Sequence, residues 1–102
     1  LSENHPTAPH IVLAEATNVL RRLERERKLS TVDAETSCSD LLALDLVLLP
    51  YEPFARRIWS LRGNLTSYDA WYVALAEALE CPLATLDRKL ARAPGPACDF
   101  LL

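Results

Sequence analysis

Residues 66–87 read TSYDAWYVALAEALECPLATLD, and this stretch decides the fold. Thr66 or Ser67 is suited to open a helix, because Ser and Thr side chains cap helix N-termini. The body of that helix, from Ala70 to Leu79, is apolar except for Glu77. Since a helix that is apolar on nearly every side is a buried one, the sequence predicts a buried helix here.

The same stretch continues as a strand and a second helix. Pro82 to Leu86 is short and mostly apolar, which favours a strand, and Asp87 to Ala93 is typical of a short helix. In the rest of the chain we predict three strands, at His10–Leu13, Leu46–Leu49 and Cys98–Leu102. We also predict three helices: an amphipathic helix from Ala14 to about Leu29, a helix from about Val32 to Ala43, and a helix from Pro53 to Gly63. Ser30 or Thr31 would cap the second of these helices. Strands that alternate with helices indicate an α/β fold with a mostly parallel sheet flanked by helices. We expect residues 1–102 to form a single domain.

Composition excludes several classes of protein. No stretch approaches the roughly 18 apolar residues of a membrane span, and the N-terminus has no export signal. With only two glycines, Gly63 and Gly95, a Gly-rich phosphate loop is excluded. The three cysteines are widely spaced, so we expect neither disulfides nor a zinc site but buried free thiols of a cytoplasmic protein.

Charge is unevenly distributed along the chain. The net charge is −3, yet five of the eleven basic residues fall between positions 21 and 28, namely Arg21, Arg22, Arg25, Arg27 and Lys28. This basic stretch has two interpretations: it contacts RNA, or it is only the solvated face of its helix.

Three acids occupy the same kind of position. Glu15, Asp69 and Asp87 each lie near the start of a predicted helix. Glu15 and Asp87 stand where a predicted strand passes into a helix, and Asp69 lies in the first turn of the buried helix. In a parallel sheet such junctions share the edge formed by the carboxyl ends of the strands, where α/β folds bind ligands. Carboxylates that meet there would hold Mg²⁺ or Mn²⁺, which prefer oxygen ligands. Each acid also has a structural explanation, since helix N-termini favour acids, and Asp87 is a plausible N-cap.

Two polar residues accompany these acids. Asn18 follows Glu15 by three residues and so shares its helix face, while Thr85 precedes Asp87 by two. Both are candidates for accessory roles in the site, although a solvated Asn and a strand Thr need no such role.

Three segments resemble a known family. Ala8–Leu20, Leu65–Leu79 and Pro82–Leu90 are similar, in order and spacing, to the acidic motifs of VapC-like PIN-domain toxins. The resemblance implies a three-layer PIN fold and Mg²⁺- or Mn²⁺-dependent endonuclease action on RNA by the toxin of a toxin–antitoxin module. It also implies a homodimer and a cognate antitoxin. Glu15, Asp69 and Asp87 take the places of three catalytic, metal-binding acids of the family, and Asn18 and Thr85 those of accessory residues.

The chain departs from the family in one respect. Family members begin with a strand that ends in a further catalytic Asp and is followed by a helix, and neither is found in these residues. Because that strand lies in the middle of the family's sheet, we expect two strand pairs with exposed inner edges. Truncation, a partner chain that fills the gap, and a decayed toxin are the three situations that would explain it.

Two other functions compete with the ribonuclease. A toxin that lacks one acid would bind an antitoxin or another toxin subunit without cutting RNA. An unrelated small α/β hydrolase would act on phosphate esters instead. Metal-dependent RNA cleavage separates the first alternative from an active toxin, and small phosphorylated substrates test the second.

Overall fold

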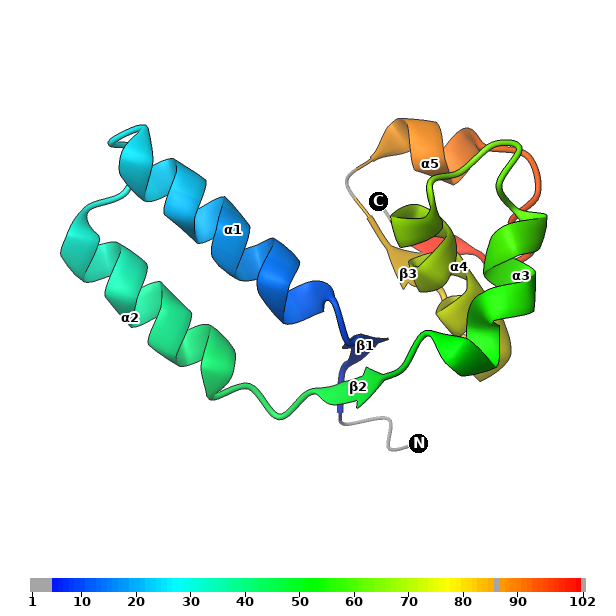
Figure 1. Ribbon diagram of the computed structural model, residues 1–102, viewed down its shortest axis with the longest axis horizontal. Coiled ribbons are helices and arrows are strands. Elements are labelled where there is room, and N and C mark those ends of the chain that lie inside the picture. The colour runs from blue at the N-terminus through cyan, green and yellow to red at the C-terminus, as the bar shows by residue number, and fades with distance from the viewer. Residues whose placement is uncertain (1–4, 86, 102) are drawn as a thin grey trace. The chain divides into compact units, whose positions relative to one another are not determined.

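The computed structural model describes residues 5–85 and 87–101, which form two compact units (Figure 1). The first unit extends to Leu48 and the second begins at Leu49. The expectation that residues 1–102 form a single domain stays a prediction. No helix in the described ranges is long and apolar enough to cross a membrane.

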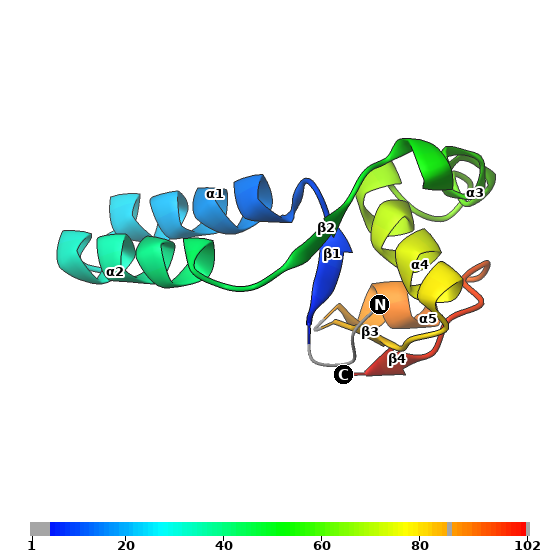
Figure 2. The ribbon, with the colours of Figure 1, turned by 90° about the horizontal axis from the view of Figure 1, so that it is seen from below.

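The first unit consists of a helical hairpin whose two ends are connected to a pair of strands. Strand β1 (Thr7–Pro9) leads into α1 (Val12–Arg25), α2 (Thr31–Leu42) returns alongside it, and β2 (Val47–Leu49) pairs with β1 (Figures 1 and 2). Val47 N–H donates to the Pro6 carbonyl at 2.9 Å. This hydrogen bond joins the start of β2 to the residue that precedes β1.

The strand predicted at His10–Leu13 is wrong, because the helix has already begun there. Val12 is the first residue of α1, and the strand lies earlier, at Thr7–Pro9. The apolar residues Val12 and Leu13 continue the three- and four-residue spacing of the helix that follows. A short apolar run is compatible with either structure, and here the helical period prevails.

The end of α1 comes four residues before the predicted Leu29. Arg27 has a left-handed φ of 58°, its N–H donates to Glu24 O at 3.0 Å, and Lys28 N–H donates to Leu23 O at 2.9 Å. These two bonds form a Schellman motif, which satisfies the last carbonyls of a helix. A non-glycine residue in this conformation costs about 1–2 kcal/mol, which explains why the sequence did not reveal the stop.

The start of α2 is confirmed as predicted. Ser30 Oγ accepts a hydrogen bond from Asp33 N–H at 3.0 Å, the usual geometry of a Ser N-cap. Ala34 is the buried residue of this helix, and Val32 and Leu42 are among its exposed apolar side chains.

Replacing Ser30 by Ala is expected to lower the free energy of unfolding by about 1 kcal/mol, because Asp33 N–H loses its acceptor. Urea denaturation followed by circular dichroism measures this loss. Ser39→Ala is the matched control, since Ser39 is exposed within α2, where Ala favours the helix. Equal losses for the two variants would show that the cap contributes nothing.

The second unit is built around the predicted buried helix. A 3-10 turn η1 (Glu52–Phe54) and α3 (Ala55–Ser60) precede α4 (Ser67–Leu79), and β3 (Leu83–Ala84), α5 (Arg88–Arg92) and β4 (Phe100–Leu101) follow. Its buried apolar side chains are Ile58, Leu61, Ala70, Trp71, Val73, Ala74, Leu75, Ala76 and Leu90. Because most of them belong to α4, this helix is the centre of the second unit.

The two tryptophans of the chain have different surroundings. Trp71 is buried in α4, with its ring edge-on to Tyr51 at 5.3 Å between centroids. Trp59 is 66% exposed, and the Arg62 guanidinium lies 4.4 Å above its ring. The guanidinium therefore forms a cation–π contact with this exposed ring.

The described strands form two separate pairs, β1 with β2 and β3 with β4. Strands β3 and β4 are parallel, with Leu83 opposite Phe100 and Ala84 opposite Leu101. Both the α/β class and the expectation of two strand pairs are thus confirmed. The predicted strand ends at Leu86 and Leu102 lie outside the described residues.

Candidate metal centre

Asp69 lies in the first turn of α4, and its backbone is fixed by the cap of that helix. Thr66 Oγ1 accepts a hydrogen bond from Asp69 N–H at 3.2 Å. The Asp69 residue is half-buried, next to the fully buried Ala70. The buried helix thus holds a carboxylate at its N-terminal end, where the helix dipole favours negative charge.

Asp87 is the N-cap of α5, as the structural explanation predicts. Its Oδ1 accepts hydrogen bonds from Lys89 N–H at 2.9 Å and Leu90 N–H at 3.2 Å. Thr85 Oγ1 in turn accepts from Asp87 N–H at 3.0 Å. In the described part of the chain the cap uses Oδ1 alone, so capping and metal binding are compatible roles for this carboxylate. Thr85 thus holds the backbone of Asp87, and its accessory role in a metal site stays a prediction.

Substitutions at Asp87 separate the cap from the metal role. Asp87→Asn is expected to leave stability unchanged, because Asn caps about as well as Asp, whereas Asp87→Ala costs about 1 kcal/mol. Thermal or urea unfolding measures both. A comparable loss in the Asn variant would contradict this account of the cap.

Glu15 lies in the first turn of α1. Its N–H donates to Ile11 O at 3.1 Å, and the residue is half-buried. Asn18, three residues on, is exposed. Glu15 therefore occupies the strand-to-helix position that the sequence indicates, with Asn18 on the same side of the helix.

The three acids belong to different units. Asp69 and Asp87 lie in the second unit, and Glu15 lies in the first. Within either unit, no group of three or more His, Cys, Asp or Glu side chains among the described residues is arranged to hold a metal. The donor chemistry fits a hard divalent cation, since all three are carboxylates. A shared centre of Glu15, Asp69 and Asp87 stays a prediction.

Comparison with known proteins identifies the family. The family model for the PIN domain matches residues 3–96 of this chain. The chain belongs to the PIN-domain family. Ribonuclease VapC1 of Mycobacterium tuberculosis is 41% identical over 103 residues, which cover 100% of this chain and 77% of that protein. Ribonuclease VapC9 of the same organism is 39% identical over 92 residues, covering 90% of this chain and 72% of that protein. The resemblance to VapC-like PIN domains is therefore confirmed.

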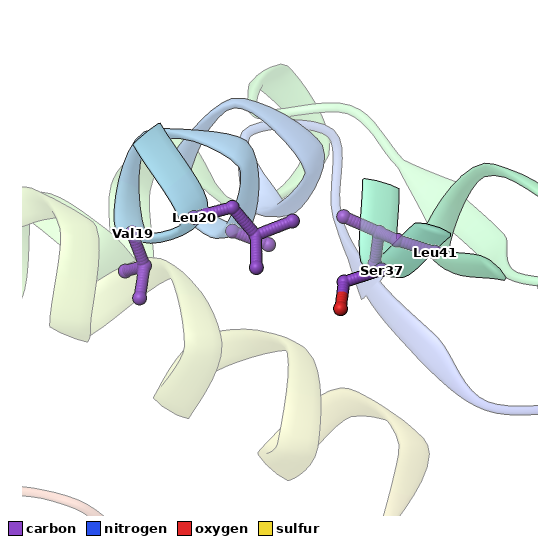
Figure 3. A pocket seen from close by; sticks show the side chains of 5 residues that line it. Val19, Leu20, Ser37 and Leu41 are labelled. Atoms are coloured by element: carbon purple, nitrogen blue, oxygen red, sulfur yellow. The ribbon is translucent and has the colours of Figure 1, made fainter. Parts of the chain in front are cut away.

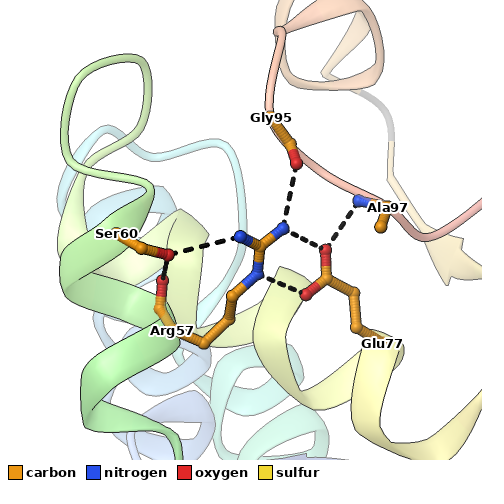
Figure 4. Close-up of polar contacts among 5 residues, drawn as sticks. All are labelled: Arg57, Ser60, Glu77, Gly95 and Ala97. Atoms are coloured by element: carbon orange, nitrogen blue, oxygen red, sulfur yellow. Dashed lines mark hydrogen bonds and ion pairs between the residues drawn. The ribbon is translucent and has the colours of Figure 1, made fainter.

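A charged network, which the sequence did not reveal, surrounds α4 in the second unit of this PIN-domain chain (Figure 4). Arg57 Nε and Nη2 donate to the two carboxylate oxygens of Glu77 at 2.7 and 2.9 Å. Arg57 also donates to Gly95 O at 2.9 Å and to Ser60 Oγ at 3.3 Å, and Ala97 N–H donates to Glu77 Oε2 at 2.6 Å. The network joins α3, α4 and the segment that leads into β4.

The network shifts the pKa values of Glu77 and of the neighbouring Cys98. Hydrogen bonds from Arg57 lower the pKa of Glu77, against the opposite effect of its partial burial. Partial burial, followed by the nearby Glu77 carboxylate, raises the pKa of the Cys98 thiol. The one sequence signal was Glu77 itself, the single charge in the apolar body of α4. Its partner Arg57 lies twenty residues earlier, and no pattern in the nearby sequence predicts that the two residues pair.

The cysteines of the PIN-domain chain are free thiols, but the prediction that they are buried is wrong. Cys81 is exposed, and Cys38 and Cys98 are half-buried. Cys81 follows Glu80, whose left-handed φ of 53° ends α4, so the chain has already left the buried helix.

An open hollow of about 430 Å³ lies between α1 and α2 (Figure 3). Its lining residues are Ala16, Val19, Leu20, Ser37 and Leu41. Because this lining is apolar apart from Ser37 and holds no acid, the hollow is distinct from the candidate metal ligands. It marks the apolar face of α1.

Proposed function

We propose that this chain is a VapC-like toxin that hydrolyses RNA phosphodiesters internally and requires a divalent metal. The observation that carries the proposal is family membership together with three acids, each at the start of a helix. Two relatives that bear the name ribonuclease support RNA as the substrate.

Glu15, Asp69 and Asp87 would hold Mg²⁺ or Mn²⁺ with their carboxylates. When bound, such an ion neutralises charge developing on the phosphate and activates water for attack. The chain's own part is to fix the ligands: Thr66 anchors the backbone of Asp69, and Thr85 anchors that of Asp87. Anchored ligands need little reorganisation during the reaction, which favours catalysis.

The expected partners follow from the same proposal. A cognate antitoxin would neutralise the toxin, a second copy of the chain would complete a homodimer, and the protein would act on RNA in the cytoplasm. Free thiols at all three cysteines agree with a reducing compartment. The alternative of a toxin that binds partners without cutting RNA has no observation in its favour.

A labelled structured RNA incubated with the folded chain and Mn²⁺ tests the proposal. We expect discrete internal fragments, and no hydrolysis of p-nitrophenyl phosphate under the same conditions. Phosphomonoester hydrolysis without RNA fragments would instead support the unrelated α/β hydrolase. A folded chain that releases no fragments with either Mg²⁺ or Mn²⁺ would contradict the endonuclease.

A further inference from the structure

Basic side chains gather on the second half of α1 and in the turn that follows it. Arg21, Arg22 and Arg25 lie in the helix, Arg27 and Lys28 lie beyond it, and all five are exposed. Glu26 is 4.0 Å from Arg22 and 3.6 Å from Lys28. Such exposed pairs contribute little, so the cations remain available to an anionic partner.

Helical spacing aligns part of this cluster with the proposed metal ligand on α1. Glu15, Asn18, Arg22 and Arg25 follow one another at steps of three, four and three residues, which places them along one face of the helix. At a rise of about 1.5 Å per residue, this polar stripe is about 15 Å long. Ala16 and Leu20, which line the hollow between α1 and α2, lie away from the stripe, whereas Val19, which also lines it, is four residues after Glu15 and borders the stripe.

Residues 21–28, which include the stripe cations Arg22 and Arg25, also stand out electrostatically. Residues 21–28 carry five cations and two acids, a net charge of +3, so the rest of the chain, with six cations and twelve acids, carries −6. An anionic strand is repelled by most of such a surface and attracted to this one part. Fields of this kind steer charged ligands toward the attractive region.

We propose that the RNA strand leaves the cleaved phosphodiester along α1, with Arg22 and Arg25 contacting its phosphates and Asn18 lying between them and Glu15. The proposal rests on the proposed function, because it places the reacting phosphate near Glu15. Arg25 lies ten residues after Glu15, about 15 Å along the helix, so the stripe is long enough to contact more than one phosphate of a strand that begins near Glu15. Arg suits phosphate because its guanidinium offers several donors in one plane.

RNA fits this stripe better than an acidic protein does. The stripe positions Asn18, Arg22 and Arg25 are all polar and exposed. The core of a protein interface is usually apolar, with few charged residues. Phosphate binding, by contrast, needs only cations at regular spacing.

The test compares two charge-matched double variants, Arg22→Gln/Arg25→Gln on the stripe and Arg27→Gln/Lys28→Gln beyond the helix. Each removes two cations, one of which is loosely paired with Glu26. We measure cleavage kinetics and, without added metal, anisotropy of a labelled single-stranded RNA at several salt concentrations. The stripe variant should raise KM and Kd about tenfold and lower the salt slope by about 1.4, at about 0.7 per lost contact, with kcat unchanged. The control variant should change either constant less than about twofold.

Other outcomes overturn the proposal. Equal losses in both variants would indicate diffuse attraction rather than a track along α1. If neither double variant changes the affinity for RNA, the stripe does not bind RNA, and an acidic protein is the remaining partner. Arg22→Lys/Arg25→Lys, which keeps the charge, should bind RNA more tightly than the Gln variant, and equal losses in the two would contradict a role for the charge. If the parent chain cuts no RNA, the proposed function fails. The anisotropy measurement still shows whether the stripe binds RNA.

Discussion

Asp69→Asn lowers the rate of RNA cleavage by about 10²–10³-fold, the usual effect of removing one preorganised charged group from a catalytic site. The substitution preserves the size of the side chain and removes only its charge. Since Asp69 follows Thr66 in the first turn of α4, its backbone hydrogen bond to the cap is retained. The loss therefore reports on the carboxylate and not on the helix. Single-turnover cleavage of a labelled RNA with Mn²⁺ measures it.

Asp33→Asn is the matched control for this experiment. Asp33 stands three residues after the Ser30 cap of α2, as Asp69 stands three residues after the Thr66 cap of α4. Both substitutions remove about the same favourable interaction with a helix dipole, roughly 0.3–1 kcal/mol of stability. We expect Asp33→Asn to cleave RNA at the parent rate. If both variants cleave RNA equally well, Asp69 only stabilises the N-terminus of its helix and takes no part in cleavage.

Arg57→Ala lowers the free energy of unfolding by about 2 kcal/mol at neutral pH. The side chain of Glu77 is only 15% exposed and would lose a bidentate partner, which is costly for a charged acceptor. The expected loss is moderate because Arg57 itself is 40% exposed and its charge is partly screened. Urea denaturation measures the effect, and the exposed neighbour Arg56 provides the control variant Arg56→Ala. A loss no larger than that of Arg56→Ala would contradict the importance of the network.

The same network predicts a dependence of stability on pH. Because the pKa of Glu77 is lowered in the folded chain, its contribution is fully present above the ordinary glutamate pKa. It is lost as the pH falls from that value through the lower folded pKa. The difference in unfolding free energy between the parent chain and Arg57→Ala should therefore shrink on acidification across this range. A difference that stays constant down to the acid limit would exclude Glu77 as its source.

Local signals in the sequence predicted the helices best. The Ser30 and Thr66 caps begin α2 and α4 where expected, and the apolar run after Asp69 is buried. Each of these features depends on residues within one or two helical turns. The strand expected at His10–Leu13 failed because four apolar residues do not distinguish a strand from the first turn of an amphipathic helix.

Features that depend on distant residues were not predictable. The pairing of Arg57 with Glu77 joins residues twenty positions apart, and the exposure of Trp59 depends on how α3 packs. The candidate site shows the same division. The helix-start positions of Glu15, Asp69 and Asp87 follow from the sequence, and so does the capping role of Asp87. The prediction that the three acids share one metal rests on the family resemblance and on the common sheet edge, because no local pattern brings the acids together.

Binding of Mn²⁺ to the folded chain, followed through the electron paramagnetic resonance signal of the free ion, tests the central claim most directly. The parent chain should bind Mn²⁺, and Glu15→Gln, Asp69→Asn and Asp87→Asn should each weaken that binding strongly. The three losses should not add, because residues that act on one ion form a single unit. Asp33→Asn should bind as the parent does. Unchanged binding in the three variants, or losses that add independently, would contradict a metal centre shared by Glu15, Asp69 and Asp87.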